Sequence, residues 1–502
     1  MNPRLAKLKE MRQCGGAVRT TGLADALIER FLQHDPALAE AIDAAYVAHL
    51  ALRSYMADVL PLDEATQIAH VQADFLNFYP ADGINPYVAL AARGPWLVTL
   101  KGAIVYDAGG YGMLGLGHTP QSVLDVLGRP QVMANVTTPS LTQLRFGKAL
   151  KQEIGRSRGG CPYVKFMCLN SGSEAVSLAA RIIDINAKLM TDPGARHADR
   201  TIKRVVVKGA FHGRTQAPAL YSDSSRTMYV QHLASFRNEQ SLLTVIPYDT
   251  AQLMRIFTDA ECNGWFIEAV FIEPVMGEGD PGRGVTPEFY ATARALTTTH
   301  GSMLLIDSIQ AGLRAHGVLS IVDYPGFEQF EAPDMEAYSK ALNAGQYPLS
   351  VLAVTDRAAR IYKEGIYGNT MTANPRALDV GCAVLSALTP EIRQNIRTRG
   401  HEFITKLEKL KADLPGYINK VQGTGLLLSC ELAPQFPCYG AGSIEEWLRE
   451  HGYGVIHGGA NSLRFTPHLA ICAEEVDLLV EGIRRALLEG PRKPQAVHAV
   501  AA

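Results

Sequence analysis

The sequence predicts an α/β protein with a large, mostly parallel-sheet domain, a smaller α+β domain and a helical extension at the N-terminus. Between about residues 118 and 385, short β-branched runs alternate with helical stretches, which is typical of a doubly wound sheet rather than a barrel. After about residue 390, a long helical pattern is followed by short strand-like runs. Between about residues 22 and 76 the apolar residues have helical spacing.

Residues 1–80 are predicted to form the helical extension. The runs LADALIERFL, ALAEAIDAAYVAHLALRSYM and ATQIAHVQADFLNFY have apolar residues at helical spacing, and the proline in VLPLDE separates the last two. In the following PWLVTLKGAIVYDAGGYGMLGLGHTP, short β-rich runs meet glycines, as in a strand hairpin that leads into a loop. We assign residues 81–117 to the small domain as its N-terminal part.

Residues 118–388 are predicted to form the large domain. Strands are expected at VKFMCL, RVVVKGAF, LTVIPY, IEAVFIEPV and SMLLIDS. Several of these runs are apolar throughout, as expected for strands buried on both faces of a mostly parallel sheet.

Residues 389–490 are predicted to complete the small domain. A long helix is expected in PEIRQNIRTRGHEFITKLEKLKADL and a final one through EEVDLLVEGIRRALLEG, with strand-like runs between them. The last segment, 491–502, has the composition of a frayed tail.

The composition argues against several classes of protein. The net charge of −2, from 48 basic and 50 acidic residues, gives no reason to expect nucleic acid or a membrane surface as a partner, so we expect a small molecule. The 8 cysteines form no C-x-x-C pair and no metal-ligand spacing, which favours reduced thiols and no metal. No segment has the apolar length of a signal sequence or a membrane span, so a cytoplasmic protein is expected.

Polar residues that follow the apolar runs are candidates for the site, because ligands of such sheets bind at the carboxyl ends of the strands. Ser171–Ser173 leads into a helix and could bind a phosphate through backbone amides, or could simply cap the helix. Phe211 and His212 lie between glycines, where an aromatic ring could stack on a planar cofactor or belong to the core. Arg214 could bind a carboxylate or lie at the surface.

Four more charged residues lie at similar junctions. Glu273 ends a strand and Glu278 lies in the loop beyond it; either could pair with a cation or orient substrate, or both could be solvated. Asp307 ends an apolar strand, where it could keep a pyridine nitrogen protonated or be structural. Lys340 ends a short apolar run, helix or strand, before a turn; partial desolvation would lower its pKa and allow imine formation. Together these groups match the requirements of pyridoxal phosphate.

The order of the motifs and their residues resemble those of the class III aminotransferases. These are fold-type-I pyridoxal-phosphate enzymes that include ornithine, acetylornithine and 4-aminobutyrate aminotransferases. The resemblance runs from NPYVALAARGPW to the last helix. It implies transamination between an amine or ω-amino acid and a 2-oxo acid, with 2-oxoglutarate and glutamate as one pair. It also implies a homodimer with shared active sites; whether dimers pair into tetramers is left open.

The resemblance assigns roles to individual residues. Lys340 forms the Schiff base, Asp307 pairs with the pyridinium nitrogen, and Gln310 contacts the ring hydroxyl. Phe211 stacks on the ring, and Thr370 reaches the phosphate of the neighbouring subunit's cofactor. The full cofactor-binding set that it implies is Ser171, Gly172, Ser173, Phe211, His212, Asp307, Gln310, Lys340 and Thr370.

Substrate-binding roles follow in the same way. Arg464 matches the arginine that binds a substrate α-carboxylate, and Glu278 matches its switching partner. Arg214 matches a second carboxylate-binding arginine, and Tyr111 the aromatic residue at the substrate mouth.

The chain also departs from the family pattern. Ser308 stands where members usually carry Glu, and the segment after Lys340 is polar and one residue longer than usual. The helical extension is longer than usual as well. Because relatives on this scaffold include racemases, aminomutases, decarboxylases and lyases, a non-transaminating enzyme is the alternative, and a catalytically silent relative is a further one.

Overall fold

The structure, a computed structural model, describes residues 2–109, 111–133 and 136–493. It divides into two compact units: the first comprises Met1–Pro120, Thr398–Gln422 and Leu428–Ala502, and the second Gln121–Arg397 and Gly423–Leu427. Among the helices described, none combines the length and apolar character needed to cross a membrane. Residues 494–502 of the predicted tail lie outside the described residues.

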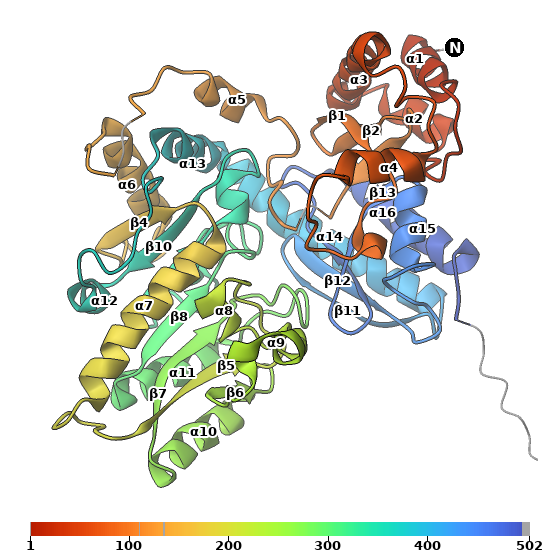
Figure 1. Cartoon of the computed structure of the whole chain (residues 1–502). Helices are drawn as coiled ribbons and strands as arrows, with labels where there is room; N and C mark the ends of the chain where they lie inside the picture. The colour runs from red at the N-terminus through yellow and green to blue at the C-terminus, as the bar shows by residue number, and fades with distance from the viewer. Residues whose placement is uncertain (1, 110, 134–135, 494–502) are drawn as a thin grey trace, which may run out of the picture. The chain divides into compact units, whose positions relative to one another are not determined.

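A seven-stranded sheet organises the second unit (Figure 1). Its spatial order is β4 (Lys165–Leu169), β10 (Ser350–Val354), β9 (Met335–Tyr338), β8 (Met303–Asp307), β7 (Trp265–Ile272), β5 (Thr201–Val207) and β6 (Leu242–Val245). β10 is antiparallel to both of its neighbours, and the other four pairings are parallel. The predicted α/β fold with a large, mostly parallel sheet is confirmed.

The five predicted strands are present, and the structure adds β9 and β10. The run before Lys340, which the sequence left open between helix and strand, is β9. β8 and β10 lie on either side of this run and provide ladder partners for its backbone, which makes it a strand. β7 to β10 are almost entirely buried, but the edge strands β4 and β6 are only partly covered despite their apolar sequences.

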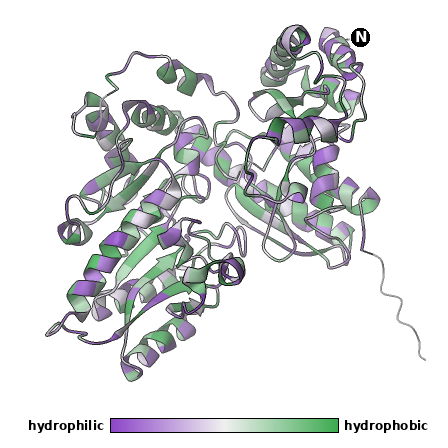
Figure 2. Cartoon of the chain, viewed as in Figure 1, coloured by the Kyte–Doolittle hydropathy of each residue, from purple (hydrophilic) through white to green (hydrophobic). Residues whose placement is uncertain are grey.

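Helices cover both faces of this sheet. α7 (Gly172–Thr191) packs across β4, β7, β9 and β10, and α10 (Thr250–Cys262) and α11 (Pro287–His300) pack on β7 and β8. The crossover through α7 runs in the opposite direction along the sheet from those through α10 and α11, so right-handed connections place α7 on the opposite face. The strands between them are strongly hydrophobic (Figure 2).

Further helices complete this unit. They are α5 (Gln121–Leu127), α6 (Leu141–Glu153), α8 (Gln216–Ala219), α9 (Arg226–His232), α12 (Asp356–Ile361), α13 (Pro375–Ala387) and the start of α14 (Pro390–Asp413). Short 3-10 turns occur at η2 (Ala234–Phe236), η3 (Ile321–Asp323) and η4 (Lys340–Asn343).

The first unit contains the predicted N-terminal helices as α2 (Asp25–Phe31), α3 (Pro36–Tyr55) and α4 (Glu64–Gln72). Asp35 caps α3 by accepting the amide of Ala37 at 2.8 Å, and Pro36 occupies the first helical position. The structure adds α1 (Pro3–Arg12), a polar helix that buries Leu5, Leu8 and Met11 on one side. Three apolar residues at intervals of three, in an otherwise polar segment, were too weak a pattern to predict a helix.

Two four-stranded sheets are formed by the early and late parts of the chain. The first sheet is β1 (Ala89–Arg93), β2 (Trp96–Thr99), β3 (Ile104–Asp107) and β13 (Tyr453–Gly454), after the short turn η1 (Ala81–Gly83). The second is β11 (Ile418–Thr424), β12 (Leu427–Leu432), β15 (Ser462–Phe465) and β14 (Ile456–Gly458). α15 (Ile444–Glu450) and α16 (Ala473–Glu489) accompany them. The parallel pairing of β3 with β13 joins segments about 350 residues apart.

Candidate active site

The carboxyl ends of β8 and β9 bring the predicted lysine and the predicted acid to the same edge of the large sheet. Asp307 is the last residue of β8 and lies opposite Ala337 of β9, three residues before Lys340. Lys340 Nζ donates a hydrogen bond to Gln310 Oε1 at 3.0 Å. The two chain segments that carry the proposed chemistry are therefore neighbours.

The backbone of Lys340 is strained. Its φ is +47°, in the left-handed region, which costs a residue with a Cβ atom about 1 kcal/mol. Strain of this kind is concentrated at active sites, where the surrounding structure holds a side chain in a required direction. The conformation of Lys340 thus favours a functional role for this partly buried residue.

Asp307 is a buried carboxylate with two fixed hydrogen bonds. Its side chain is 4% exposed, and Oδ2 accepts from Nδ1 of the fully buried His212 at 2.8 Å. Oδ1 accepts the amide of Ile309 at 3.1 Å. Because a carboxylate only accepts, Nδ1 of His212 donates in this contact. An ionised acid in this position could hold a proton on a pyridine nitrogen.

The start of α7 is consistent with both interpretations of Ser171–Ser173, as a helix cap and as a phosphate-binding segment. Ser171 and Glu174 form a capping box, with the hydroxyl of Ser171 accepting from the Glu174 amide at 3.3 Å. The amides of Gly172 and Ser173 belong to the first helical turn, where N–H groups lack intrahelical acceptors and can bind an anion. A Cβ atom on Gly172 would lie 2.7 Å from the side chain of Ile309, so glycine allows the loop after Asp307 to approach.

The hydrogen bonding of Gln310 indicates whether the residues present fit a pyridoxal cofactor. Its side chain is buried, and within the described part of the chain Nε2 has no hydrogen-bond partner, while Oε1 accepts from Lys340. A buried amide N–H group beside the lysine would be satisfied by an oxygen on a bound ring. The amine, the acid, the buried donor and the helix start together fit this cofactor.

Phe211 and Arg214 lie close together in the loop after β5. The guanidinium carbon of Arg214 is 5.0 Å from the centre of the Phe211 ring, a cation–π distance. Arg214 is exposed, and Glu278, in the loop after β7, is partly buried. Thr370 is exposed in the segment between α12 and α13. The predicted roles of these four residues stay predictions.

Tyr111 and Arg464 belong to the first unit. Arg464, on β15, is almost fully buried, and its guanidinium carbon lies 5.5 Å from the centre of the Tyr111 ring. The Tyr111 ring stacks on Tyr79 at 6.0 Å, and burial raises the pKa of the Tyr111 phenol. The predicted carboxylate-binding arginine and the aromatic residue are therefore in contact with each other.

Glu336 is a buried residue that was not among the predicted site residues, and its carboxylate is the partner of the Ser308 hydroxyl. The hydroxyl of Ser308, which directly follows β8, donates to Oε1 of Glu336 on β9 at 2.6 Å. The same carboxylate accepts from Tyr163, Ser320 and the amide of Ile321. Glu336 therefore ties the residue after Asp307 to the neighbouring strand. A glutamate within the apolar run MEAY was the available signal, because a buried charge needs partners.

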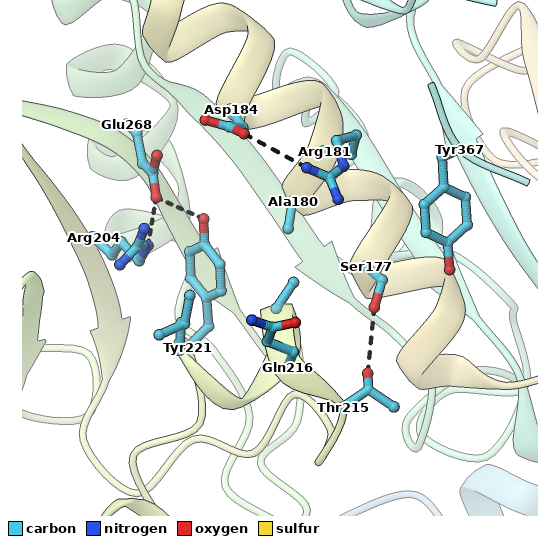
Figure 3. A pocket seen from close by; sticks show the side chains of 12 residues that line it. Ser177, Ala180, Arg181, Asp184, Arg204, Thr215, Gln216, Tyr221, Glu268 and Tyr367 are labelled. Carbon is cyan, nitrogen blue, oxygen red and sulfur yellow. Dashed lines mark hydrogen bonds and ion pairs between the residues drawn. The ribbon is translucent and has the colours of Figure 1, made fainter. Parts of the chain in front are cut away.

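A separate polar cavity lies beside α7 (Figure 3). It has a volume of about 450 Å³, and none of the predicted site residues lines it. Glu268 of β7 accepts from the hydroxyl of Tyr221 at 2.8 Å and pairs with Arg204 Nε at 2.6 Å. Both partners of the Glu268 carboxylate are therefore residues that line the cavity.

One cluster of potential metal ligands, His197, Glu261 and His300, lies far along the sheet from Lys340, at the opposite strand ends. Nε2 of His300 accepts the amide of Ile267 at 3.2 Å, so the proton of a neutral ring is on Nδ1, which faces Glu261 at 3.2 Å. A protonated nitrogen does not ligate a metal, and this geometry is that of a hydrogen-bonded cluster.

The fold and the site define an α/β enzyme with a lysine and a buried acid at the carboxyl ends of adjacent strands. A family model for class III aminotransferases matches residues 79–487, and the chain belongs to this family. The predicted activity, pyridoxal-phosphate-dependent transamination, is thereby confirmed, and the non-transaminating alternatives are not favoured.

Curated relatives and solved structures agree with this family. The chain is 28% identical to acetylornithine aminotransferase of Neisseria meningitidis serogroup B over 81% of its length and 95% of that protein. It is 27% identical to the Mycobacterium leprae protein of the same name, over 80% and 91%. Its fold resembles ornithine aminotransferase from Toxoplasma gondii, with a TM-score of 0.71 and 23% identity over 87% of this chain and 98% of that one.

Proposed function

We propose that this aminotransferase moves the amino group of an amine or ω-amino acid to a 2-oxo acid, with 2-oxoglutarate as the acceptor. The observation that carries the proposal is the hydrogen bond of 3.0 Å from Lys340 Nζ to Gln310, at the sheet edge that also holds Asp307. The relatives named after acetylornithine and ornithine support a donor with an amino group at the end of a chain.

The residues of this chain would perform distinct tasks. Lys340 would hold the cofactor and then carry a proton to and from the reacting carbon of the substrate. Asp307, oriented by His212, would keep a proton on the ring nitrogen, and the amides of Gly172 and Ser173 would hold the phosphate. Pyridoxal phosphate, when bound, supplies an aldehyde that reacts with amines and a ring that withdraws electrons from the reacting carbon.

A screen of amine donors with 2-oxoglutarate, read as glutamate formed, tests the proposal. We expect glutamate with ornithine-type donors, and Arg214→Ala should raise the KM for 2-oxoglutarate about tenfold or more, because a charged hydrogen-bond donor is lost. Arg181→Ala is the matched control, since this exposed arginine of α7 lies near Asp184 and should leave the KM unchanged. Absence of glutamate with every donor would contradict the proposed acceptor.

We also propose that the enzyme is a homodimer with shared active sites. Thr370 is exposed, and the nearby Met371, Leu144 and Val136 expose 49%, 55% and 52% of their surface, which an interface would cover. Sedimentation should give twice the chain mass of 54.5 kDa. If Thr370 acts across the interface, mixing inactive Lys340→Ala and Thr370→Ala chains should restore activity, because one site of the mixed dimer is intact. Failure of the mixed dimer to recover activity would contradict sharing.

A further inference from the structure

Glu273 is a buried carboxyl group that connects two loops of the candidate active site. It directly follows β7 and is 5% exposed. Oε1 accepts the amide of Phe211 at 2.9 Å, and Oε2 accepts the amide of Gly277 at 2.8 Å. The first loop carries Phe211 and His212, and the second carries Glu278 next to Gly277. One side chain therefore fixes the backbone of both loops.

We propose that Glu273 is a positioning residue that holds these two loops around the cofactor ring and whose ionisation is coupled to protonation of the ring nitrogen. The second part rests on the proposed function, in which that nitrogen faces Asp307.

The charges around Glu273 explain how such coupling would arise. Burial raises the pKa of Glu273 to about 7; the neighbouring His212 opposes this shift, and Asp307 adds to it. These two groups approach from the loop after β5 and from the end of β8. From the segment after β6, the hydroxyl of Tyr248 donates to the backbone carbonyl of Glu273 at 3.3 Å.

A protonated ring beside Asp307 would add a positive charge to this cluster. It would lower the pKa of Glu273 and favour its ionised form, so that ring binding releases a proton near neutral pH. Because coupling is reciprocal, ionisation of Glu273 must strengthen binding of the protonated ring by the same factor. Glu273→Gln removes this step, since an amide does not ionise.

Binding of pyridoxamine 5′-phosphate tests the coupling, because this probe lacks the aldehyde and cannot bond to Lys340. The Kd is measured between about pH 5.5 and about pH 8.5, on either side of the Glu273 pKa. We expect the ratio of Kd for Glu273→Gln to Kd for the wild type to rise about tenfold over this range. Glu268→Gln is the matched control, since Glu268 is a buried glutamate of β7 that pairs with Arg204 and Tyr221. The ratio of Kd for Glu268→Gln to Kd for the wild type should not change with pH. A flat ratio for Glu273→Gln would overturn the coupling.

Hydrogen exchange of the cofactor-free protein tests the positioning part independently. Segments 208–215 and 274–280 should exchange faster in Glu273→Gln, because one of the two amides would face the N–H₂ group, and exchange in Glu268→Gln should be unchanged there. Glu273→Asp is a second variant that keeps the charge but is too short to reach both amides, so it should lose protection and retain the pH coupling. Equal exchange in all variants would overturn the positioning role. If the wild type failed to bind the probe, the proposed cofactor site would fail, while exchange would still decide whether Glu273 holds the loops.

Discussion

Lys340→Ala is expected to abolish the visible absorbance of the bound cofactor and to lower turnover by about 10⁴-fold or more. The substitution removes both the amine that holds the cofactor and the group that carries the proton, and each role contributes orders of magnitude. Alanine keeps the Cβ atom, so the backbone strain at φ +47° is unchanged and the fold should persist. Absorbance spectra and steady-state rates at saturating donor measure the effect.

Lys203→Ala is the matched control for this experiment. Lys203 also belongs to the second unit, but its Nζ bonds to the carbonyl of Gln240 and lies over the ring of Trp265, away from the site. Its spectrum and turnover should equal those of the wild type. Retention of the visible absorbance by Lys340→Ala would refute the role assigned to this lysine.

Asp307→Asn should lower kcat by about 10³-fold while part of the cofactor stays bound. The amide has almost the same shape and can still accept from Nδ1 of His212, but it lacks the charge that keeps the ring nitrogen protonated. The loss should therefore fall on kcat rather than on the KM for the donor, because the charge acts mainly on the reacting state. Single-turnover rates with the donor separate this effect from cofactor loss.

Asp323→Asn is the control for replacing a buried aspartate. Asp323 accepts the amides of Gly155 and Ser157 at 2.7 and 2.8 Å, and neither of these residues belongs to the predicted site. We expect this variant to lower the free energy of unfolding by about 1–2 kcal/mol and to leave kcat unchanged. A kcat near the wild-type value in Asp307→Asn would contradict the role of Asp307.

The strands of the large sheet illustrate what sequence patterns predict well. β7 and β8 are apolar apart from Glu268 and the terminal Asp307, and burial on both faces of a parallel sheet favours such runs whatever the surroundings. β9 was left open because a run of four residues fits either a helix or a strand. Its state depends on β8 and β10, which lie next to it only in the folded protein.

The candidate site shows the same division. The lysine, the acid and the helix start were predicted from their positions after apolar runs and from the resemblance to a family. The contact between His212 and Asp307, at 2.8 Å, joins residues 95 positions apart, and no pattern in the sequence indicates it. Glu336 was missed for this reason too, because its partners come from three separate segments.

By itself, the sequence determined the fold class, the order of the strands along the chain and the residue types available for chemistry, because hydrophobic spacing and turn residues act locally. Only the tertiary structure decided which side chains meet: the lysine beside Gln310, the histidine on the buried acid, and one carboxyl group holding two loops. The physical reason is that hydrogen bonds and charges act over a few ångströms in space, and folding, not chain order, sets those distances.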